Sequence, residues 1–182
     1  MQAVLILIDI QNDYFPGGNL ELVGMTQAAA QAQALLTAWR QARLPLVHVQ
    51  HVSLGTDATF FRPDTVGVNI HESLQPLDDE PVIRKHYPNA FRETGLMEAL
   101  KTAGGEELVI CGAMSHMCID ATTRAAFDFG FRCTVIHDAC ATRDLVFEGL
   151  TIPAAQVHGA FMAALGMRYA SLRSAQQFLS GL

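Results

Sequence analysis

Short apolar runs recur along the chain and alternate with longer amphipathic segments. Such runs, rich in β-branched and aliphatic residues, are typical of strands buried on both faces of a parallel sheet. We expect six strands, over residues 4–10, 46–52, 81–87, 108–111, 131–137 and 168–172. Because strands that alternate with helices form parallel sheets with right-handed crossovers, the pattern predicts an α/β fold: a three-layer αβα sandwich, Rossmann-like in outline, around a six-stranded parallel sheet.

The segments between these runs are rich in helix-forming residues and carry start and stop signals. We expect helices over residues 28–42, 95–103, 115–129 and 154–165, and a terminal helical turn over 174–179. Hydroxyl side chains are placed to cap the first three helices, namely those of Thr26, Thr94 and Ser115. Pro153 suits the start of the fourth helix. Glycines follow the last three helices as stop signals, at Gly104, Gly105, Gly130 and Gly166.

No repeat or low-complexity linker divides the chain, so we expect residues 1–182 to form a single domain. Residues 53–80 are the least regular part, because they lack a clear period and are rich in Asp, Thr, Pro and Gly. A loop of this length in a compact domain is usually functional or disordered. Its Phe60, Phe61 and Arg62 could form either a substrate lid or a contact between subunits, and the sequence leaves both open.

Composition argues against several classes of partner. Half of the 182 residues are hydrophobic and 16% are charged, which suits a compact soluble protein. The formal net charge is −6 and no run of Lys or Arg forms a basic stripe, so we expect no nucleic-acid partner. The apolar N-terminus is interrupted by Asp9 and lacks the basic start and cleavage site of a signal peptide. No uncharged run is long enough to span a bilayer, so we expect no membrane partner.

The cysteines give no sign of a zinc site or of a disulfide framework. They lack paired CxxC spacing and stand at Cys111, Cys118, Cys133 and Cys140. In the absence of a secretion signal, we expect reduced thiols and a cytoplasmic location.

The central stretch LVICGAMSHMCIDATTRAAFDFGF, residues 108–131, is typical of a buried strand that ends at Gly112, turns tightly and starts a helix. Cys118 then lies in the first helical turn. The free N–H groups and the positive end of the helix dipole favour a thiolate there and could hold an oxyanion. A lone cysteine is more often a small buried hydrophobe, so this position alone does not establish catalysis.

Asp9 and Lys85 follow other strands of the predicted sheet. Because the carboxyl ends of parallel strands open onto one edge, a base, a cation and the Cys118 thiol could meet there. Asp9 and Lys85 also have plainer interpretations, as a cap for the next turn and as a solvated surface charge. Tyr14 and Phe15, in the loop over residues 11–18, are available to line a pocket.

Four segments of the sequence resemble the isochorismatase-like cysteine hydrolases, a family that includes nicotinamidases, N-carbamoylsarcosine amidases and streptothricin hydrolases. They are LILIDIQNDYF, RKHYPNAF, VICGAMSHMCIDATTRAAFDFGF, and VIHDACAT with the later HGAFMAAL, in this order over nearly the whole chain. The resemblance implies the isochorismatase-like hydrolase fold and a catalytic triad of Asp9, Lys85 and Cys118.

The resemblance also implies a cis peptide bond between Ala113 and Met114. The backbone N–H groups of Met114 and Cys118 would then form an oxyanion hole. For the substrate pocket we expect contributions from four side chains, those of Gln11, Phe15, Phe61 and His116.

Two departures from the family narrow the expected chemistry. Metal-binding nicotinamidases carry an Asp-x-His pattern after the second strand, which HVQHVSLGTDATFF lacks. His48 and His51 point to opposite faces of a strand and cannot chelate one metal together, so we expect neither metal nor cofactor. Family members that hydrolyse the vinyl ether of isochorismate can lack the cysteine. This chain keeps Cys118, which favours C–N hydrolysis.

The leading hypothesis is a metal-independent cysteine amidohydrolase acting on a small amide, lactam, ureide or carbamoyl compound. Asp9 would take the thiol proton, Lys85 would stabilise the anions, and Cys118 would form a thioester that water hydrolyses. The alternatives are an isochorismate pyruvate-hydrolase without a covalent intermediate and a catalytically silent binding or assembly subunit. From Phe60, Phe61 and the family's habit of assembling, we expect a homo-oligomer, a dimer or larger.

Overall fold

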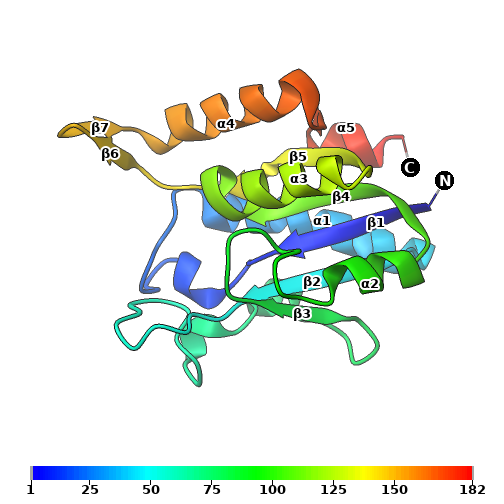
Figure 1. Cartoon of the computed structure of the whole chain (residues 1–182), viewed down its shortest axis with the longest axis horizontal. Helices are drawn as coiled ribbons and strands as arrows, with labels where there is room; N and C mark the ends of the chain where they lie inside the picture. The colour runs from blue at the N-terminus through cyan, green and yellow to red at the C-terminus, as the bar shows by residue number, and fades with distance from the viewer. Residues whose placement is uncertain (1, 182) are drawn as a thin grey trace.

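The computed structural model describes residues 2–181, and its main sheet is parallel and covered by helices on both faces (Figure 1). The strands are β1 (Gln2–Ile8), β2 (Leu46–His51), β3 (Val82–Lys85), β4 (Gly105–Ala113), β5 (Arg132–Ala141) and β8 (Ser171–Arg173). They lie in the order β3-β2-β1-β4-β5-β8, and each neighbouring pair is parallel. The predicted six-stranded α/β sandwich is confirmed.

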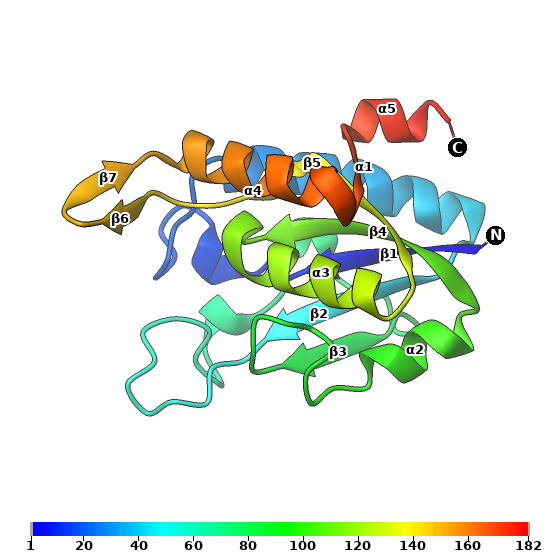
Figure 2. The same ribbon diagram turned by 45° about the horizontal axis from the view of Figure 1, so that its top comes forward.

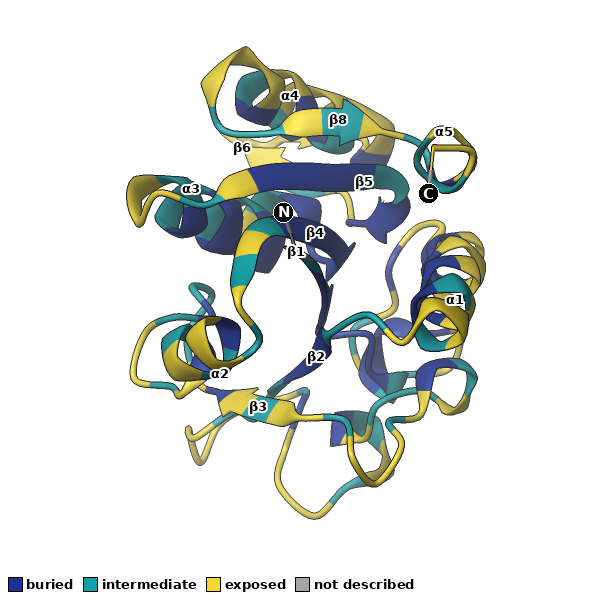
Figure 3. Ribbon diagram, turned by 90° about the vertical axis from the view of Figure 1, so that its right-hand side faces the viewer, coloured by how far each residue is buried: buried dark blue, intermediate teal, exposed yellow. Residues whose placement is uncertain are grey.

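The helices form the two outer layers, which Figures 2 and 3 show from different sides. One face of the sheet is covered by α1 (Met25–Ala42) and α5 (Ala175–Leu179). The other face is covered by α2 (Leu96–Thr102), α3 (Asp120–Asp128) and α4 (Ala154–Arg168). Short 3₁₀ turns add η1 (Asn12–Tyr14), η2 (Val66–Val68) and η3 (Glu72–Leu74). Within the described residues, no helix has the length and apolar character needed to cross a membrane.

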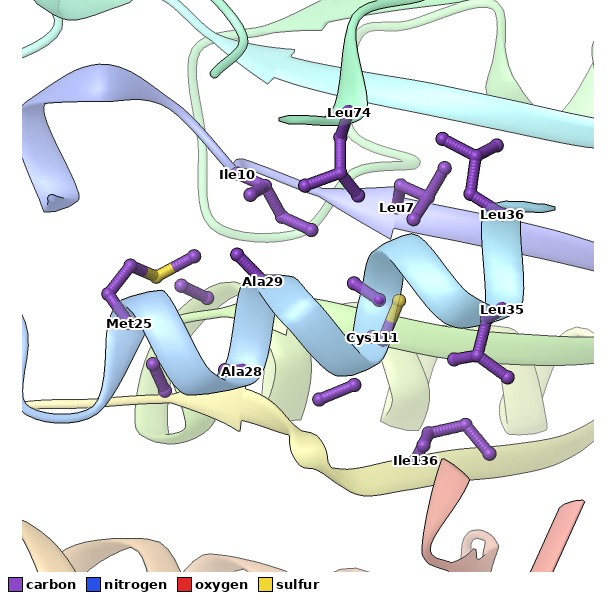
Figure 4. Packing of buried hydrophobic residues seen from close by; sticks show 14 of the residues in the cluster. Leu7, Ile10, Met25, Ala28, Ala29, Leu35, Leu36, Leu74, Cys111 and Ile136 are labelled. Carbon is purple, nitrogen blue, oxygen red and sulfur yellow. The ribbon is translucent and has the colours of Figure 1, made fainter. Parts of the chain in front are cut away.

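The central strands are apolar on both faces, as a covered parallel sheet requires. In β1, Leu5 and Leu7 belong to the core beneath α1, whereas Val4 and Ile6 belong to the core beneath α2, α3 and α4. Figure 4 shows α1 lying against its face of the sheet, with Leu36 beside Leu7. A slip of one residue would exchange the two faces, so burial on both sides fixes the register that brings the strand ends into line.

The irregular segment 53–80 is tied to the body of the protein by Asp13. The buried Asp13 carboxylate accepts hydrogen bonds from the Phe61 N–H at 2.6 Å and from the Asn19 side chain at 2.8 Å. Gly67 packs so closely on this carboxylate that a Cβ would overlap it. Phe61 is fully buried with φ 52°, a left-handed conformation that such a side chain adopts only when its surroundings hold it.

Two of the expected helix caps differ in the structure. Thr26 does not cap α1, which begins at Met25 after Gly24, because Gly24 has φ 75° and takes the cap position without a side-chain bond. Thr94 lies one residue before Gly95, which occupies the N-cap position of α2. Its hydroxyl nevertheless accepts a hydrogen bond from the Leu96 N–H at 3.2 Å, so it still serves the helix start.

The C-terminal part of the chain departs further from the sequence pattern. Gly166 does not stop α4, which continues to Arg168. A Cβ at Gly166 would lie 3.0 Å from the side chain of Leu172, so the glycine is a packing residue and not a stop signal. The last strand, β8, consequently begins at Ser171, later than expected.

A two-stranded hairpin of β6 (Leu145–Phe147) and β7 (Leu150–Ile152) was not expected from the sequence. It projects from the end of the body in Figures 1 and 2. Its turn consists of Glu148 and Gly149, both with positive φ, which is the signature of the tight turns that join antiparallel strands. Each strand is too short to give a clear alternating pattern.

Gly112 does not end the central strand, which continues to Ala113. It has φ 125°, and a Cβ would overlap the carbonyl of Ile8 on the neighbouring β1. Only glycine lets the two strands stay adjacent at this level. Gly112 therefore sets the spacing of β1 and β4 just before Asp9, which follows β1, and before the turn after β4 that contains Cys118.

We predict that Gly112→Ala lowers the free energy of unfolding by about 3 kcal/mol or more, because it combines left-handed strain with a steric overlap. Gly17→Ala is the matched control, since Gly17 also has a positive φ of 84° but nothing within 4 Å of a built Cβ. Its cost should be about 1 kcal/mol. Urea unfolding measures both, and equal losses in the two variants would contradict the assigned role of the overlap.

Candidate active site

Cys118 lies in a π-helical turn, Ser115–Ile119, between β4 and α3. This differs from the expected first turn of an α-helix capped by Ser115, because Met114 occupies the cap position. Ser115 is fully buried, and its hydroxyl instead lies 2.9 Å from His158 Nδ1 and 3.3 Å from the Ala141 carbonyl. The serine is thus used to hold the turn against α4 and β5. Single π-turns of this kind are frequent at functional sites.

Asp9 follows β1 directly and is completely buried. Its φ of 53° is left-handed, an outlier that is more common where function demands a particular side-chain direction. Lys85 Nζ lies 2.7 Å from Asp9 Oδ2 in an ion pair. Among the described residues neither carboxylate oxygen has a conventional hydrogen bond besides this pairing. A buried carboxylate with spare acceptor capacity is suited to receive a proton.

Lys85 ends β3, is completely buried and contacts several groups at once. Besides the ion pair with Asp9, its Nζ lies 2.9 Å from His51 Nδ1 and donates to the Tyr87 carbonyl at 3.1 Å and to Cys118 Sγ at 3.2 Å. Burial alone would lower the pKa of Lys85, but the charges of Asp9 and Cys118 outweigh it and raise the pKa. Lys85 therefore remains an ammonium ion.

The Cys118 thiol keeps its proton at rest, which corrects the expectation of a stable thiolate. Burial and the Asp9 carboxylate raise its pKa, and Lys85 only partly opposes them. One cation faces two acids here, so ionising both would leave a net negative charge in a buried site. Asp9 and Cys118 consequently hold one proton between them, and a thiolate forms when that proton moves to Asp9.

The other thiols lack these neighbours. Burial raises the pKa of Cys111 far above its ordinary value and raises those of Cys133 and Cys140 to about 12. Cys111 lies within β4 and has no exposed surface, as expected for a structural cysteine.

The backbone before Cys118 has an unusual peptide bond and an N–H group without a backbone acceptor. The peptide bond between Ala113 and Met114 is cis, at the place the sequence resemblance implied. The Met114 carbonyl accepts hydrogen bonds from the N–H groups of Met117 at 3.0 Å and Ile119 at 3.2 Å, and it passes over the Cys118 N–H. The Met114 N–H also has no backbone acceptor among the described residues.

The four expected pocket residues play unequal parts. Gln11 is fully buried, and its amide is used entirely by backbone groups, including both the N–H and the carbonyl of His51. Phe15 stacks on His71 with ring centroids 3.6 Å apart. Phe61 lies nearer the triad. The structure therefore gives Gln11 a supporting position behind the site.

Phe61 contacts aromatic rings near Lys85 and Asp9, whereas His116 contacts the end of β5. The Phe61 ring centroid lies 5.7 Å from that of His51 and 4.6 Å from that of Tyr14. His116 belongs to the nucleophile turn, and its Nδ1 lies 2.6 Å from Thr142 Oγ1.

Sequence reasoning missed His51 at this site, and it named Tyr14 only as a residue available to line a pocket. Burial, followed by the charges of Cys118 and Asp9, raises the pKa of Tyr14, so its neutral phenol faces the triad. His51 is the last residue of β2, the strand between β1 and β3. Because the carboxyl ends of parallel strands share one edge, its position at a strand end could have predicted its place beside Asp9 and Lys85. His48 points to the opposite face as predicted, where its Nε2 lies 3.0 Å from Glu80.

Asp9, His51 and Cys118 also form the one group in the described chain with the composition of a metal site, since their ligand atoms lie within 4.8 Å of one another. The ammonium of Lys85 contacts all three side chains. A metal ion would therefore have to displace a buried cation that the site already holds.

We predict that Asp9→Asn makes Cys118 more reactive toward iodoacetamide while Lys85→Met makes it less reactive. Asp9 raises the pKa of the thiol and Lys85 lowers it, so the pH midpoint of alkylation should fall in the first variant and rise in the second, each by about one unit or more. Each variant removes one charge of the same buried pair, so a general loss of stability cannot produce opposite shifts. Brief alkylation over a pH series, followed by peptide mapping, measures both midpoints. Shifts of the same sign would contradict the shared-proton description.

Comparisons with known proteins agree with this geometry. Residues 3–163 match the model of the isochorismatase domain. The chain is 50% identical over 179 residues to YddQ, an uncharacterized isochorismatase family protein of Bacillus subtilis (strain 168), covering 98% of this chain and 99% of that protein. It is 34% identical over 169 residues to a streptothricin hydrolase of Streptomyces noursei, covering 91% of this chain and 60% of that protein.

Among solved structures, a putative isochorismatase hydrolase from Oleispira antarctica superimposes with a TM-score of 0.95 at 50% sequence identity, over 98% of this chain and 96% of that one. The family model covers most of the sequence, and the fold agrees with it throughout. The chain therefore belongs to the isochorismatase family and is a hydrolase of the isochorismatase-like α/β fold.

Proposed function

We propose that the protein is a metal-independent cysteine hydrolase that cleaves a C–N bond of a small amide, lactam, ureide or carbamoyl compound. The observation that carries the proposal is the Asp9 carboxylate, which is buried beside the Cys118 thiol and paired with the Lys85 ammonium. In this arrangement a base, a cation and a nucleophile are in contact before substrate arrives.

The first half of the reaction forms a thioester. Asp9 takes the proton from Cys118 Sγ, and the thiolate attacks the substrate carbonyl carbon. The N–H groups of Met114 and Cys118 stabilise the oxyanion, and the Lys85 ammonium stabilises the thiolate and the carboxylate in turn. The tetrahedral intermediate collapses when Asp9 returns its proton to the leaving nitrogen, which departs as ammonia or an amine.

The second half regenerates the enzyme. Water enters where the amine left and gives a proton to Asp9 as it attacks the thioester carbon. The carbon–sulfur bond breaks, the proton returns to Cys118, and a carboxylic acid is released. The buried site keeps the same net charge through each proton transfer between Asp9 and Cys118, which suits a low-dielectric environment.

The similarity to a streptothricin hydrolase supports hydrolysis as the reaction class, and the presence of Cys118 favours cleavage of a C–N bond. The family model, which is named for isochorismatase, keeps a second candidate open: hydrolysis of the vinyl ether of isochorismate without a covalent intermediate. A catalytically silent binding or assembly subunit is the third. Trapping an acyl adduct on Cys118 separates the first candidate from the other two.

A cation beside the site supports a substrate with a negatively charged group. Arg143 is exposed, follows the end of β5 by two residues and has no ion pair among the described residues. Its neighbour Thr142 contacts His116 in the nucleophile turn, and β5 pairs Ala141 with Ala113 at the start of that turn. A substrate screen should therefore pair each neutral amide with a carboxylate-bearing analogue.

We further place the enzyme in the cytoplasm, a proposal supported by its four unpaired, buried cysteines, which suit a reducing compartment. We also propose a homo-oligomer, a dimer or larger, in which the hairpin of β6 and β7 is a contact. Its Val146, Phe147 and Leu150 side chains are 71%, 67% and 73% exposed. A two-stranded hairpin is marginally stable alone, so burial against another copy would stabilise it.

We predict that the triad acts as a unit in turnover. On a substrate that releases ammonia, Asp9→Asn, Lys85→Met and Cys118→Ala should each lower kcat by about a thousandfold or more, and pairs of these changes should cost little beyond one. Wild-type protein should also form a trappable acyl adduct on Cys118. Near wild-type kcat/KM in a folded Asp9→Asn or Lys85→Met protein would overturn the proposal.

The same assay tests independence from metal. Exhaustive EDTA treatment should leave activity unchanged, because the ammonium of Lys85 already fills the position between the possible ligands. A large loss that zinc or manganese restores would contradict this part of the proposal.

We predict that Phe147→Ser shifts the protein toward monomer at micromolar concentration, because it removes the aromatic side chain from the hairpin. Met167→Ser is the control, since Met167 is 86% exposed on α4, away from the hairpin. Sedimentation velocity compares the two. If wild type is already a monomer, or if both variants assemble equally well, the hairpin is not the contact.

A further inference from the structure

His51 is held in place by a side chain from another strand end. The Gln11 amide donates to the His51 carbonyl at 2.9 Å and accepts from the His51 N–H at 2.8 Å. Gln11 has no exposed surface, and its second Nε2 hydrogen bond reaches the Val68 carbonyl at 2.7 Å. These bonds hold the backbone of His51 in place at the end of β2.

The ring of His51 is directed at Lys85, with Nδ1 2.9 Å from Nζ. An ammonium ion has no lone pair, so Nδ1 must accept and the remaining ring proton lies on Nε2. Burial and the charge of Lys85 lower the pKa of His51 to about 4. The imidazole is therefore neutral at pH 7 and available as an acceptor.

The four groups around the ammonium differ in what happens to them during the proposed reaction. Asp9, at 2.7 Å, and Cys118, at 3.2 Å, exchange a proton, so the negative charge near Lys85 moves from one to the other. His51 and the Tyr87 carbonyl, at 2.9 and 3.1 Å, keep the same charge throughout. They are fixed acceptors for an ammonium that would otherwise follow the moving charge.

We propose that His51 is a positioning residue, whose neutral imidazole accepts a hydrogen bond from Lys85 and holds the ammonium between Asp9 and Cys118 while the proton passes between them. This inference rests on the proposed function, because it assumes that Asp9 and Cys118 exchange that proton. His51 touches no reacting atom and acts through Lys85. Gln11 then contributes indirectly, because it holds the backbone of His51, whose ring in turn holds Lys85.

The test compares two substitutions at His51. His51→Asn is expected to keep an acceptor oxygen close to the position of Nδ1, whereas His51→Leu removes the acceptor and keeps an apolar side chain. We expect His51→Leu to lower kcat by about ten- to hundredfold, with KM changed less than about twofold, and His51→Asn to recover most of the loss. His48→Leu is the matched control, a histidine of the same strand that faces Glu80 instead of the triad.

Iodoacetamide provides a second measurement that needs no substrate. In His51→Leu the ammonium is no longer held beside the sulfur, so the pH midpoint for alkylation of Cys118 should rise, whereas His51→Asn should stay near wild type. An unchanged midpoint and a kcat within twofold of wild type in His51→Leu would overturn the inference. So would equal losses in the Asn, Leu and His48→Leu proteins that follow their melting temperatures.

The two proposals fail in different ways. If Cys118→Ala keeps full hydrolytic activity, the proposed function is wrong, and the alkylation midpoints still report whether His51 holds Lys85. If Cys118, Asp9 and Lys85 are all required but His51→Leu behaves as wild type in both measurements, only the inference about His51 is wrong.

Discussion

The buried ion pair between Asp9 and Lys85 is the interaction on which the rest of the site depends. Both residues have no exposed surface, and removing an isolated charge from water costs roughly several kcal/mol. At 2.7 Å the two charges compensate one another, but only while β1 and β3 keep their positions on either side of β2. The pair thus joins the ends of β1 and β3 across β2, and a break in this edge of the sheet would leave an uncompensated charge.

The same pair explains how a thiol with a raised pKa can serve a reaction that needs a thiolate. Removing the proton to solvent would leave an additional negative charge in a buried site. Passing the proton to Asp9 moves the negative charge from Asp9 to Cys118 without changing the net charge of the site. Lys85 contacts both side chains and can stabilise the charge on either. In the proposed reaction, the Met114 N–H, which has no backbone acceptor among the described residues, is available to the charge that develops on the substrate.

Much of the fold followed from the sequence, because buried parallel strands are legible as apolar runs and their carboxyl ends meet at one edge. From that rule we expected that Asp9, Lys85 and Cys118 could meet, and the family resemblance named these three residues as a triad. The protonated state of Cys118 could not be predicted from the sequence. The position of Cys118 near a helix start can be read locally, whereas the Asp9 charge that raises its pKa comes from a residue far away in the chain. The cap expected at Thr26 was wrong and the hairpin after Arg143 was missed for a related reason. Both depend on positive φ angles, at Gly24 and at Glu148 and Gly149, which hydrophobic periodicity does not reveal.

His51 was not predicted as a site residue because its role depends on residues far away in the chain. In sequence it is one of two histidines in an ordinary strand, and its partners stand at Gln11 and Lys85. No spacing within β2 could distinguish it from His48. Its place at the edge shared with Asp9 was the available signal, and applying that rule to every strand end would have included it.

The anchoring of Phe61 by Asp13 separates two parts of the molecule that can change independently. On the site side, Phe61 is fixed by a carboxylate that belongs to the segment after β1. On the outer side, residues 54–57 are exposed and contribute to neither hydrophobic core. Insertions or exchanges there would leave the contact between Asp13 and Phe61 and the buried charges of Asp9 and Lys85 in place.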